Sequence, residues 1–150
     1  MPRGAPRLFA ETLATWERDA LIAALSRAGL PSQDVAQPDK LFWRFTEDDV
    51  PVGFGGLEVH GEDGLMRSLV TLPPVRGRGI GTTIVAALEF EARLHECRNL
   101  WLITNTAAEF YERLGYARCD RAVVPPAIAA TGEFAELCPA NADVLMKKLM

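Results

Sequence analysis

A ten-residue segment near the middle of the chain combines three glycines with two arginines, a composition suited to binding phosphate groups. Residues 75–84 read Val-Arg-Gly-Arg-Gly-Ile-Gly-Thr-Thr-Ile and lie between a predicted strand and a predicted helix. Glycine lets the backbone turn tightly and bring its N–H groups close to a ligand. The N-terminus of the following helix adds about half a positive charge, and the two arginines add full charges. The segment is therefore a candidate pyrophosphate site.

Several loop patterns compete for this segment. A Walker A loop needs a lysine, and the segment contains none, so that pattern is excluded. The dinucleotide-binding pattern G-x-G-x-x-G begins at Gly77 and Gly79 but has Thr82 where the third glycine belongs, and the preceding strands fit a βαβ unit poorly. The pattern R-x-x-G-x-G is matched in full by Arg76, Gly79 and Gly81. A glycine-rich turn without any ligand is the alternative.

A glutamate in an otherwise apolar predicted strand is a candidate proton acceptor. Glu58 lies in the run Gly53–Val59, beside the expected acceptor site. Burial there would raise the pKa of its carboxyl toward a value useful for taking a proton from an amine. The alternatives are that Glu58 faces solvent, or that it forms an ion pair with Arg67 or Arg44.

The next predicted strand carries Arg67 and Ser68. An arginine in an apolar strand is costly unless it is paired. Arg67 is therefore either a clamp for an acidic group of the substrate, with Ser68 beside it, or the ion-pair partner of Glu58. Strand alternation places Arg67 on the same face as Leu69 and Thr71, and Ser68 on the other, unless a bulge changes the phase.

No metal site is expected. His60 and His95 have no acidic or thiol side chain beside them at metal-binding spacing. Cys97, Cys119 and Cys138 are odd in number and form no C-x-x-C pair, which argues against a zinc ribbon or a disulfide framework. We interpret Cys138 as an inert packed thiol, with an arsenic ligand as the alternative.

Hydrophobic spacing and turn residues predict the elements that position these groups. The predicted strands are 7–10, 41–45, 50–60, 65–72, 100–103, 116–124 and 144–150. The predicted helices are 15–28, a helix running from the glycine-rich segment to about residue 95, a short helix opened by a capping box at Thr106 and Glu109 and closed by Gly115, and a helical segment over 125–137. This order predicts an α+β domain with a mixed, mostly antiparallel sheet and helices on both faces.

Size and charge limit the function classes. The 150 residues fit one domain, 1–150, and the formal net charge of -4 argues against nucleic acid as a partner. No apolar run reaches the roughly 20 residues of a membrane span, and no secretory signal is expected at the N-terminus. We expect a cytoplasmic protein with no membrane partner, and a homodimer is left open as its assembly.

A second motif follows about 30 residues after the glycine-rich segment. It reads Ala107-Ala-Glu-Phe-Tyr-Glu-Arg-Leu-Gly-Tyr116. Together the two motifs resemble the GCN5-related N-acetyltransferase (GNAT) superfamily, in which an R-x-x-G-x-G loop after the fourth strand holds coenzyme A and an A-x-x-F-Y-x-x-x-G-[FY] helix follows the fifth. The resemblance extends over about residues 7–150 and implies a GNAT fold, with acetyl-CoA as cosubstrate.

The resemblance also implies roles for individual residues. The pyrophosphate cradle is implied to be Arg76, Gly77, Arg78, Gly79, Ile80 and Gly81, with Thr82 next to it. Leu69 and Thr71 would pair with the pantetheine amides, in a gap between the fourth and fifth strands. Tyr111 matches the tyrosine that protonates the departing thiolate. Asn105, one position later than the family's asparagine, is assigned a pantetheine contact.

A narrower resemblance concerns the acceptor. Met66–Val70, Thr104–Ala107 and the Pro-rich stretch from 125 to 139 are similar to N-acetyltransferases found with arsenic-resistance genes. The implied reaction is direct acetyl transfer, in a ternary complex, to a small-molecule amine such as a phosphinothricin-like or arsenic-containing amino acid. Glu58 and Tyr111 would be catalytic, and Arg67, Ser68 and Glu58 would contact the acceptor. A non-catalytic acyl-CoA-binding module and a protein or peptide N-acetyltransferase are the alternatives.

Overall fold

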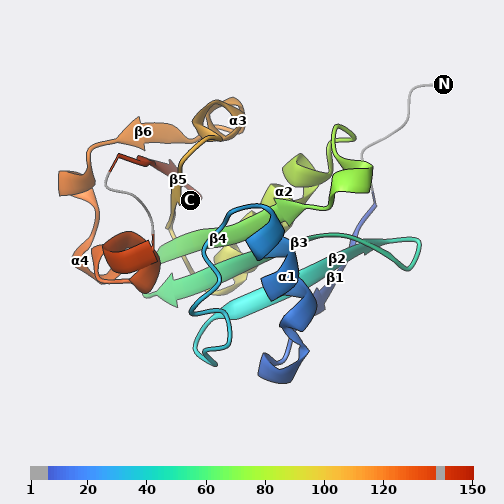
Figure 1. Ribbon diagram of the computed structural model, residues 1–150. Coiled ribbons are helices and arrows are strands. Elements are labelled where there is room, and N and C mark those ends of the chain that lie inside the picture. Colours follow the sequence, from blue (N-terminus) through green and yellow to red (C-terminus); the bar gives the residue numbers. More distant parts are fainter. Residues whose placement is uncertain (1–6, 138–140) are drawn as a thin grey trace.

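Seven strands form a single mixed sheet in a computed structural model that describes residues 7–137 and 141–150 (Figure 1). The strand order is β1-β2-β3-β4-β5-β7-β6, and only β4 and β5 are parallel neighbours. The strands are β1 (Phe9–Thr12), β2 (Leu41–Glu47), β3 (Val50–His60), β4 (Asp63–Thr71), β5 (Asn99–Thr104), β6 (Ala117–Cys119) and β7 (Asp143–Lys148). The predicted α+β class is confirmed.

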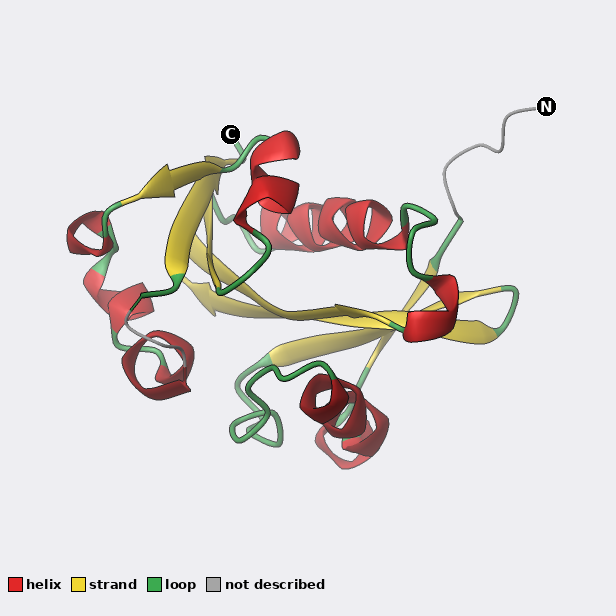
Figure 2. Cartoon of the chain, turned by 45° about the horizontal axis from the view of Figure 1, so that its top comes forward, coloured by secondary structure: helices red, strands yellow, loops and turns green. Residues whose placement is uncertain are grey.

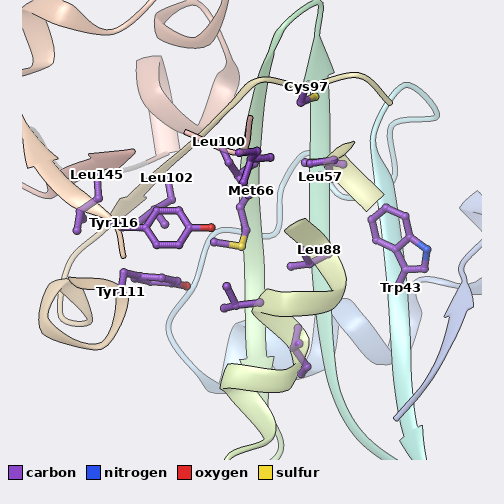
Figure 3. Close-up of a cluster of buried hydrophobic side chains, with 14 of the residues drawn as sticks. Trp43, Leu57, Met66, Leu88, Cys97, Leu100, Leu102, Tyr111, Tyr116 and Leu145 are labelled. Atoms are coloured by element: carbon purple, nitrogen blue, oxygen red, sulfur yellow. The ribbon is translucent and has the colours of Figure 1, made fainter. Parts of the chain in front are cut away.

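The two longest helices cover opposite faces of the sheet (Figure 2). On one face, α2 (Ile80–Leu94) contributes Leu88 and other apolar side chains to a cluster with Leu57 of β3 and Met66 of β4 (Figure 3). On the other face, α1 (Asp19–Arg27) packs with Phe42 and Val70. A third cluster joins β5 and β7 to α4 (Pro126–Ala129). No helix in the described parts of the chain is both long and apolar enough to span a bilayer.

The central strands β2, β3 and β4 form the predicted meander, and glycines in β3 let neighbouring elements approach closely. A Cβ added at Gly56 would lie 2.6 Å from the ring of Phe42 on β2. A Cβ added at Gly53 would lie 2.7 Å from Cδ1 of Ile84 on α2. The same Cβ at Gly53 would lie 2.6 Å from the backbone oxygen of Val70 on β4, which cannot move without shifting the sheet. Glycine at these two positions therefore allows Phe42 and β4 to lie close to β3.

The parallel pair β4–β5 is closed at one end and open at the other. The two strands pair only where Asp63–Leu65 lies beside Asn99–Trp101. At this end the side chain of Asp63 stabilises the pairing of β4 with β5, because its Oδ1 accepts hydrogen bonds from Asn99 Nδ2 at 3.2 Å and from Trp101 Nε1 at 2.9 Å. Beyond it β4 continues beside β3, whereas β5 continues beside β7, so the sheet divides.

The first helix predicted over 15–28 is divided in two. A 3-10 turn covers Thr15–Glu17, and α1 begins only at Asp19. The division falls at Arg18, a buried residue whose guanidinium donates to four backbone carbonyls, including those of Val35 at 2.8 Å and Lys40 at 3.1 Å. These distant partners hold Arg18 out of a regular helix. The first strand is Phe9–Thr12 rather than 7–10.

Short-range hydrogen bonds also shorten the predicted C-terminal elements. The strand predicted over 116–124 is only Ala117–Cys119, because Asp120 Oδ1 accepts from Ala122 N at 2.9 Å and starts a 3-10 turn. The helical segment predicted over 125–137 consists of α4 and a five-residue π-helical turn, Glu133–Leu137. The Thr131 hydroxyl ends α4 by donating to Ile128 O at 2.7 Å.

The capping box predicted at Thr106 and Glu109 is wrong. Helix α3 (Ala108–Arg113) has Ala107 at its N-cap position, and no side chain of that residue caps it. Instead the hydroxyl of Thr104, at the end of β5, accepts a hydrogen bond from Ala107 N at 3.1 Å. The strand end thus fixes where the helix begins. Cys138 and the tail over 1–6 lie outside the described residues.

Candidate active site

A cavity of about 620 Å³ occupies the space between the diverging strands β4 and β5. Met66–Thr71 of β4 and Leu102–Thr104 of β5 form two of its walls. The segment Ala28–Pro31 after α1, the start of α3 and Glu133 complete it. The predicted site residues that line it are Arg67, Ser68, Leu69, Thr71, Arg76, Asn105 and Tyr111. Glu58 and the residues from Gly77 to Thr82 are not among its lining residues.

A β-bulge in β4 decides which of its side chains share a face. Ser68 has a φ of 57°, and the pairing with β3 gains one residue on β4 at this point. Met66 and Leu69 both pack into the cluster under α2, whereas Val70 belongs to the cluster under α1. Arg67 lies over the Phe42 ring, also on the α1 side. Simple alternation, with Arg67 beside Leu69, therefore does not hold, because a bulge, the exception allowed above, is present and changes the phase.

The glycine-rich segment forms the turn from β4 into α2. Gly77 and Gly79 have φ values of 84° and 78°, a backbone region that side chains other than glycine rarely occupy. Gly79 is the N-cap of α2, a 15-residue helix with no acidic residue in its first turn. Arg76 borders the cavity, and Arg78 pairs with Glu47 at 2.8 Å. Backbone N–H groups of the turn, the N-terminus of α2 and the Arg76 side chain therefore lie at the end of β4, an arrangement that suits a polyphosphate.

Tyr111 enters the cavity from α3 and is almost completely buried. Its ring packs edge-on against those of Phe110 and Tyr116, with centroids 5.0 and 5.7 Å away. In Figure 3 the hydroxyls of Tyr111 and Tyr116 point in the direction of Met66. Burial and, second to it, the charge of Glu133 raise the pKa of Tyr111, so its phenol stays protonated at neutral pH. A protonated phenol in this position can donate to a leaving thiolate.

A hydrogen-bonded group behind Tyr111 holds its neighbour Tyr116 in place. The Tyr116 hydroxyl donates to Glu89 Oε2 of α2 at 2.8 Å. Lys147 of β7 donates to the same oxygen at 3.1 Å and to Leu114 O at 2.9 Å. This group connects α2, β7 and the end of α3, and so fixes the wall against which Tyr111 packs.

Arg67 is the centre of a buried charged cluster on the α1 side of β4. Its guanidinium binds both carboxylate oxygens of Asp34, with Nη2 to Oδ1 at 2.6 Å. Nη1 also donates to Glu58 Oε2 at 2.9 Å, and Nε donates to Ser68 Oγ at 3.2 Å. The ion pair between Arg67 and Glu58 is thus formed, and Glu58 is buried rather than facing solvent. Lys40 Nζ lies 4.0 Å from Glu58 Oε1 on the far side.

The sequence analysis missed Glu133, the first residue of the π-helical turn. Its side chain is buried, lines the cavity, and has Oε2 3.6 Å from Arg67 Nε. Burial raises the pKa of Glu133 to about 7; the Arg67 charge opposes this rise, and Glu58 and Asp34 add to it. The sequence did contain a signal for Glu133, which follows an uncharged run from Ala122 to Gly132. The same kind of signal, an acidic residue among uncharged ones, had pointed to Glu58.

The described residues contain no group of three or more His, Cys, Asp or Glu side chains placed to hold a metal ion. Tyr111, Glu133 and the turn at Arg76 supply the cavity with a protonated phenol, a buried carboxyl and a cationic group. Such a set can bind an anionic cosubstrate at one end and move protons at the other.

Comparison with known proteins identifies the family. Residues 38–118 match the family model of the acetyltransferase (GNAT) domain, which is more than half of the chain. The chain belongs to the GNAT acetyltransferase family. The matched region of this GNAT chain runs from just before β2 into β6 and so contains the diverging strands, the glycine-rich turn and α3. The search of curated protein sequences found no match to this chain.

Solved structures share the GNAT fold at low sequence identity. N-acetylglutamate synthase from Neisseria gonorrhoeae, complexed with coenzyme A and L-arginine, has a TM-score of 0.77 and 13% identity over 95% of this chain, which spans only 33% of that protein. A Mycobacterium tuberculosis protein in complex with CoA and NLQ has a TM-score of 0.77 and 20% identity, covering 95% of this chain and 99% of that one. A Thermoplasma acidophilum N-acetyltransferase in complex with coenzyme A has a TM-score of 0.66 and 15% identity, covering 95% and 99%. The GNAT fold of this chain is thus shown.

Proposed function

We propose that this GNAT chain transfers the acetyl group of acetyl-CoA directly to the amine of a small molecule, with both substrates bound at once. The cavity between β4 and β5 carries the proposal, because it connects the cationic turn at Arg76 with the buried groups Tyr111, Arg67 and Glu133. A cosubstrate bound by its phosphates at the turn would have its acyl end near these groups. The coenzyme A found in the three structural neighbours supports this choice of cosubstrate.

In this proposal the residues from Arg76 to Thr82 cradle the pyrophosphate. Leu69 and Thr71 of β4 line the path of the pantetheine arm, and Asn105 lines the opposite wall. Beyond Leu65 the edge of β4 that faces β5 has no strand partner in the sheet. The amides of the pantetheine arm would supply hydrogen-bonding partners for that edge, as an added strand does.

Tyr111 would act as the general acid. The amine nitrogen attacks the thioester carbonyl carbon, a C–N bond forms, and the C–S bond breaks. The leaving thiolate then takes the phenolic proton of Tyr111, which is available because burial raises the pKa of that phenol. The tyrosine regains a proton when the new amide nitrogen loses one.

A small acceptor fits the cavity better than a protein segment does. The acceptor end of the cavity is bounded by Ala28–Pro31, Glu133 and Ala142, from segments on either side of β4. A polypeptide acceptor needs a groove open at both sides. Walls contributed by several separate segments favour a free amine over a protein or peptide acceptor.

For the acceptor we propose an amino acid or amino acid analogue, including the phosphinothricin-like and arsenic-containing compounds that the narrower resemblance implies. Two of the neighbours were solved with L-arginine or NLQ together with coenzyme A. Arg67 and Ser68 line the acceptor end, but Asp34, Glu58 and Ser68 already take four of the five guanidinium N–H groups. Arg67 can therefore give an acidic group at most one hydrogen bond and not a bidentate clamp.

The setting that we propose is the reducing cytoplasm, where the thiols of Cys97 and Cys119 stay free. The test is calorimetry with acetyl-CoA, followed by thiol release measured with a panel of amino acids, phosphinothricin, an arsenic-containing analogue and simple diamines. We expect micromolar binding of acetyl-CoA and thiol release that depends on an added amine. Binding without release for any amine would support the non-catalytic alternative, and no binding would refute the proposal.

A further inference from the structure

The buried cluster on the α1 side of β4 contains three carboxyl groups in unlike situations. Asp34 and Glu58 are each hydrogen-bonded to the Arg67 guanidinium, Asp34 through two oxygens. Burial tends to raise the pKa of Asp34, but its bonds to Arg67 outweigh this and lower the pKa. Asp34 therefore stays an anion at neutral pH and serves to fix Arg67.

Glu133 differs from the other two carboxyl groups in position. It borders the cavity, whereas Asp34 and Glu58 do not. Its Oε2 lies 3.6 Å from Arg67 Nε, beyond the range of a good hydrogen bond, and that Nε donates to Ser68 Oγ at 3.2 Å. The guanidinium thus forms a longer ion pair with Glu133, while its N–H groups bond to Asp34, Glu58 and Ser68.

We propose that Glu133 is the general base of the acetyl transfer, taking a proton from the acceptor when a primary amine enters the cavity as its ammonium ion. This inference rests on the proposed function above. Glu133 and Tyr111 both line the cavity, and the Glu133 charge acts on the Tyr111 phenol, so base and acid share one reaction space. The sequence had offered Glu58 for this role, but Glu58 faces Arg67 and Lys40 instead.

The proton balance gives Glu133 and Tyr111 successive steps. The Glu133 carboxylate takes one proton from R–NH3+, which leaves the neutral amine that attacks the thioester. After the C–N bond forms, the nitrogen loses a second proton, and the thiolate gains one through Tyr111. The products are the N-acetyl compound, the free thiol of coenzyme A, and one proton that Glu133 later releases to solvent.

The charge of Glu133 affects the acidity of Tyr111 in a direction that favours the reaction. Because the negative charge of Glu133 helps to raise the pKa of Tyr111, the proton that Glu133 takes from the amine removes that contribution. Tyr111 then becomes the stronger acid at the stage when the thiolate needs a proton. Glu133 itself, with a pKa of about 7, is ionised in a useful fraction at neutral pH and still basic enough to accept a proton.

The test compares the pH dependence of kcat/KM for the acceptor in wild type and in Glu133→Gln, using the amine of the panel that wild type acetylates fastest. Glu133 works as the anion, so wild-type activity should fall as the pH drops through about 7. In Glu133→Gln we expect kcat/KM to fall about 10²–10⁴-fold at neutral pH. The inflection near pH 7 should disappear, and kcat/KM should instead keep rising toward the pKa of the amine, because the variant depends on amine that is already neutral. Affinity for acetyl-CoA, measured by calorimetry, should stay within about threefold, because an amide of the same size would keep the shape of the wall.

Two controls separate the base from a structural group. Glu62→Gln makes the same chemical change at an exposed ion pair with Arg98, and should leave the profile unchanged. Glu58→Gln tests Glu58, the rival candidate for the base. If the inflection near pH 7 is lost in Glu58→Gln but kept in Glu133→Gln, the proposal is overturned. A loss in Glu133→Gln that is equal at every pH would also overturn it.

A measurement on wild type tests the role of Glu133 even if the Glu133→Gln variant does not fold. Infrared difference titration of folded wild type, with acetyl-CoA bound, should show one carboxyl group that ionises near pH 7. Its absence would overturn the role of Glu133 even if the enzyme is active. If wild type binds acetyl-CoA but acetylates no amine, the proposed function fails and the proposed role of Glu133 fails with it; the infrared band still distinguishes a titrating carboxyl from a fixed one.

Discussion

At the scale of single residues, Tyr111 and Tyr116 provide a test and its control. Both are buried phenols whose rings are in contact. Tyr111 lines the cavity, whereas the Tyr116 hydroxyl donates to Glu89 behind it. We therefore expect the two hydroxyl groups to contribute to different properties, Tyr111 to turnover and Tyr116 to stability.

Tyr111→Phe should lower kcat by at least about tenfold, since general acid catalysis contributes typically about 10²–10⁴-fold and water can replace part of it. The ring packing stays, so KM for acetyl-CoA should change little. Tyr116→Phe should instead lower the melting temperature, because Glu89 loses a buried donor. Steady-state kinetics beside melting curves measure both, and equal kcat values for Tyr111→Phe and wild type would remove Tyr111 from the mechanism.

Glu58 is expected to act on stability rather than on the acceptor. Glu58→Gln removes one charged partner of the buried Arg67, which keeps its two bonds to Asp34. A hydrogen bond between charged groups contributes about 1.5–3 kcal/mol, and about 2–4 °C of melting temperature accompanies each kcal/mol in a chain of this size. The exposed Glu62→Gln should cost almost nothing. A Glu58→Gln variant with normal melting and a raised acceptor KM would contradict this assignment.

At the scale of elements, the turn before α2 is the part that the cosubstrate should need. Gly79→Asp puts a negative group where the pyrophosphate is proposed to bind, and it also strains a backbone with a φ of 78°. Gly61, in the turn from β3 to β4, has a φ of 66°, and like Gly79 it has no atom within 4 Å of an added Cβ. Gly61→Asp therefore introduces the same charge and a similar backbone strain, but at a position away from the proposed pyrophosphate site.

We expect both aspartate variants to lose similar stability, but only Gly79→Asp to lose acetyl-CoA binding. The loss should exceed about tenfold in Kd by calorimetry, since like charges about 4 Å apart near a protein surface repel by about 4 kcal/mol, and about 1.4 kcal/mol corresponds to a tenfold change. Equal affinities in the two variants would show that the turn does not hold the cosubstrate.

The same scale shows what could be predicted from sequence. The meander, α2 and the turn between them follow from local patterns, the period of apolar residues and the placement of glycines, and these predictions agree with the structure. The bulge at Ser68 and the division of the first helix at Arg18 depend on partners far along the chain. Asp34 and Arg67 are 33 positions apart in the sequence, and no local pattern predicts that they form a pair. The uncharged run before Glu133 was visible in the sequence, but the approach of that carboxyl group to Arg67 and to the cavity was not, and so Glu58 was preferred.

At the scale of the whole molecule, the sheet consists of two halves. Strands β1 to β4 form one, and β5, β7 and β6 form the other. The halves pair directly only where Asp63–Leu65 lies beside Asn99–Trp101. Helix α2 provides a second connection, through its core cluster and through Glu89, which accepts from Lys147 of β7. The candidate active site lies between the halves, so a ligand there would contact both.

This arrangement predicts where acetyl-CoA should protect backbone amides. If the pantetheine arm lies between the diverging strands, peptides that contain Met66–Thr71 and Leu102–Asn105 should exchange hydrogen more slowly when acetyl-CoA is bound, because their facing edges gain partners. Peptides from β1, at the far edge of the sheet, should not change. Hydrogen exchange by mass spectrometry, with Gly79→Asp as the variant that does not bind, measures this. Protection confined to the turn, with none on either strand, would mean that the cofactor binds outside the cavity and that the gap between the halves has another use.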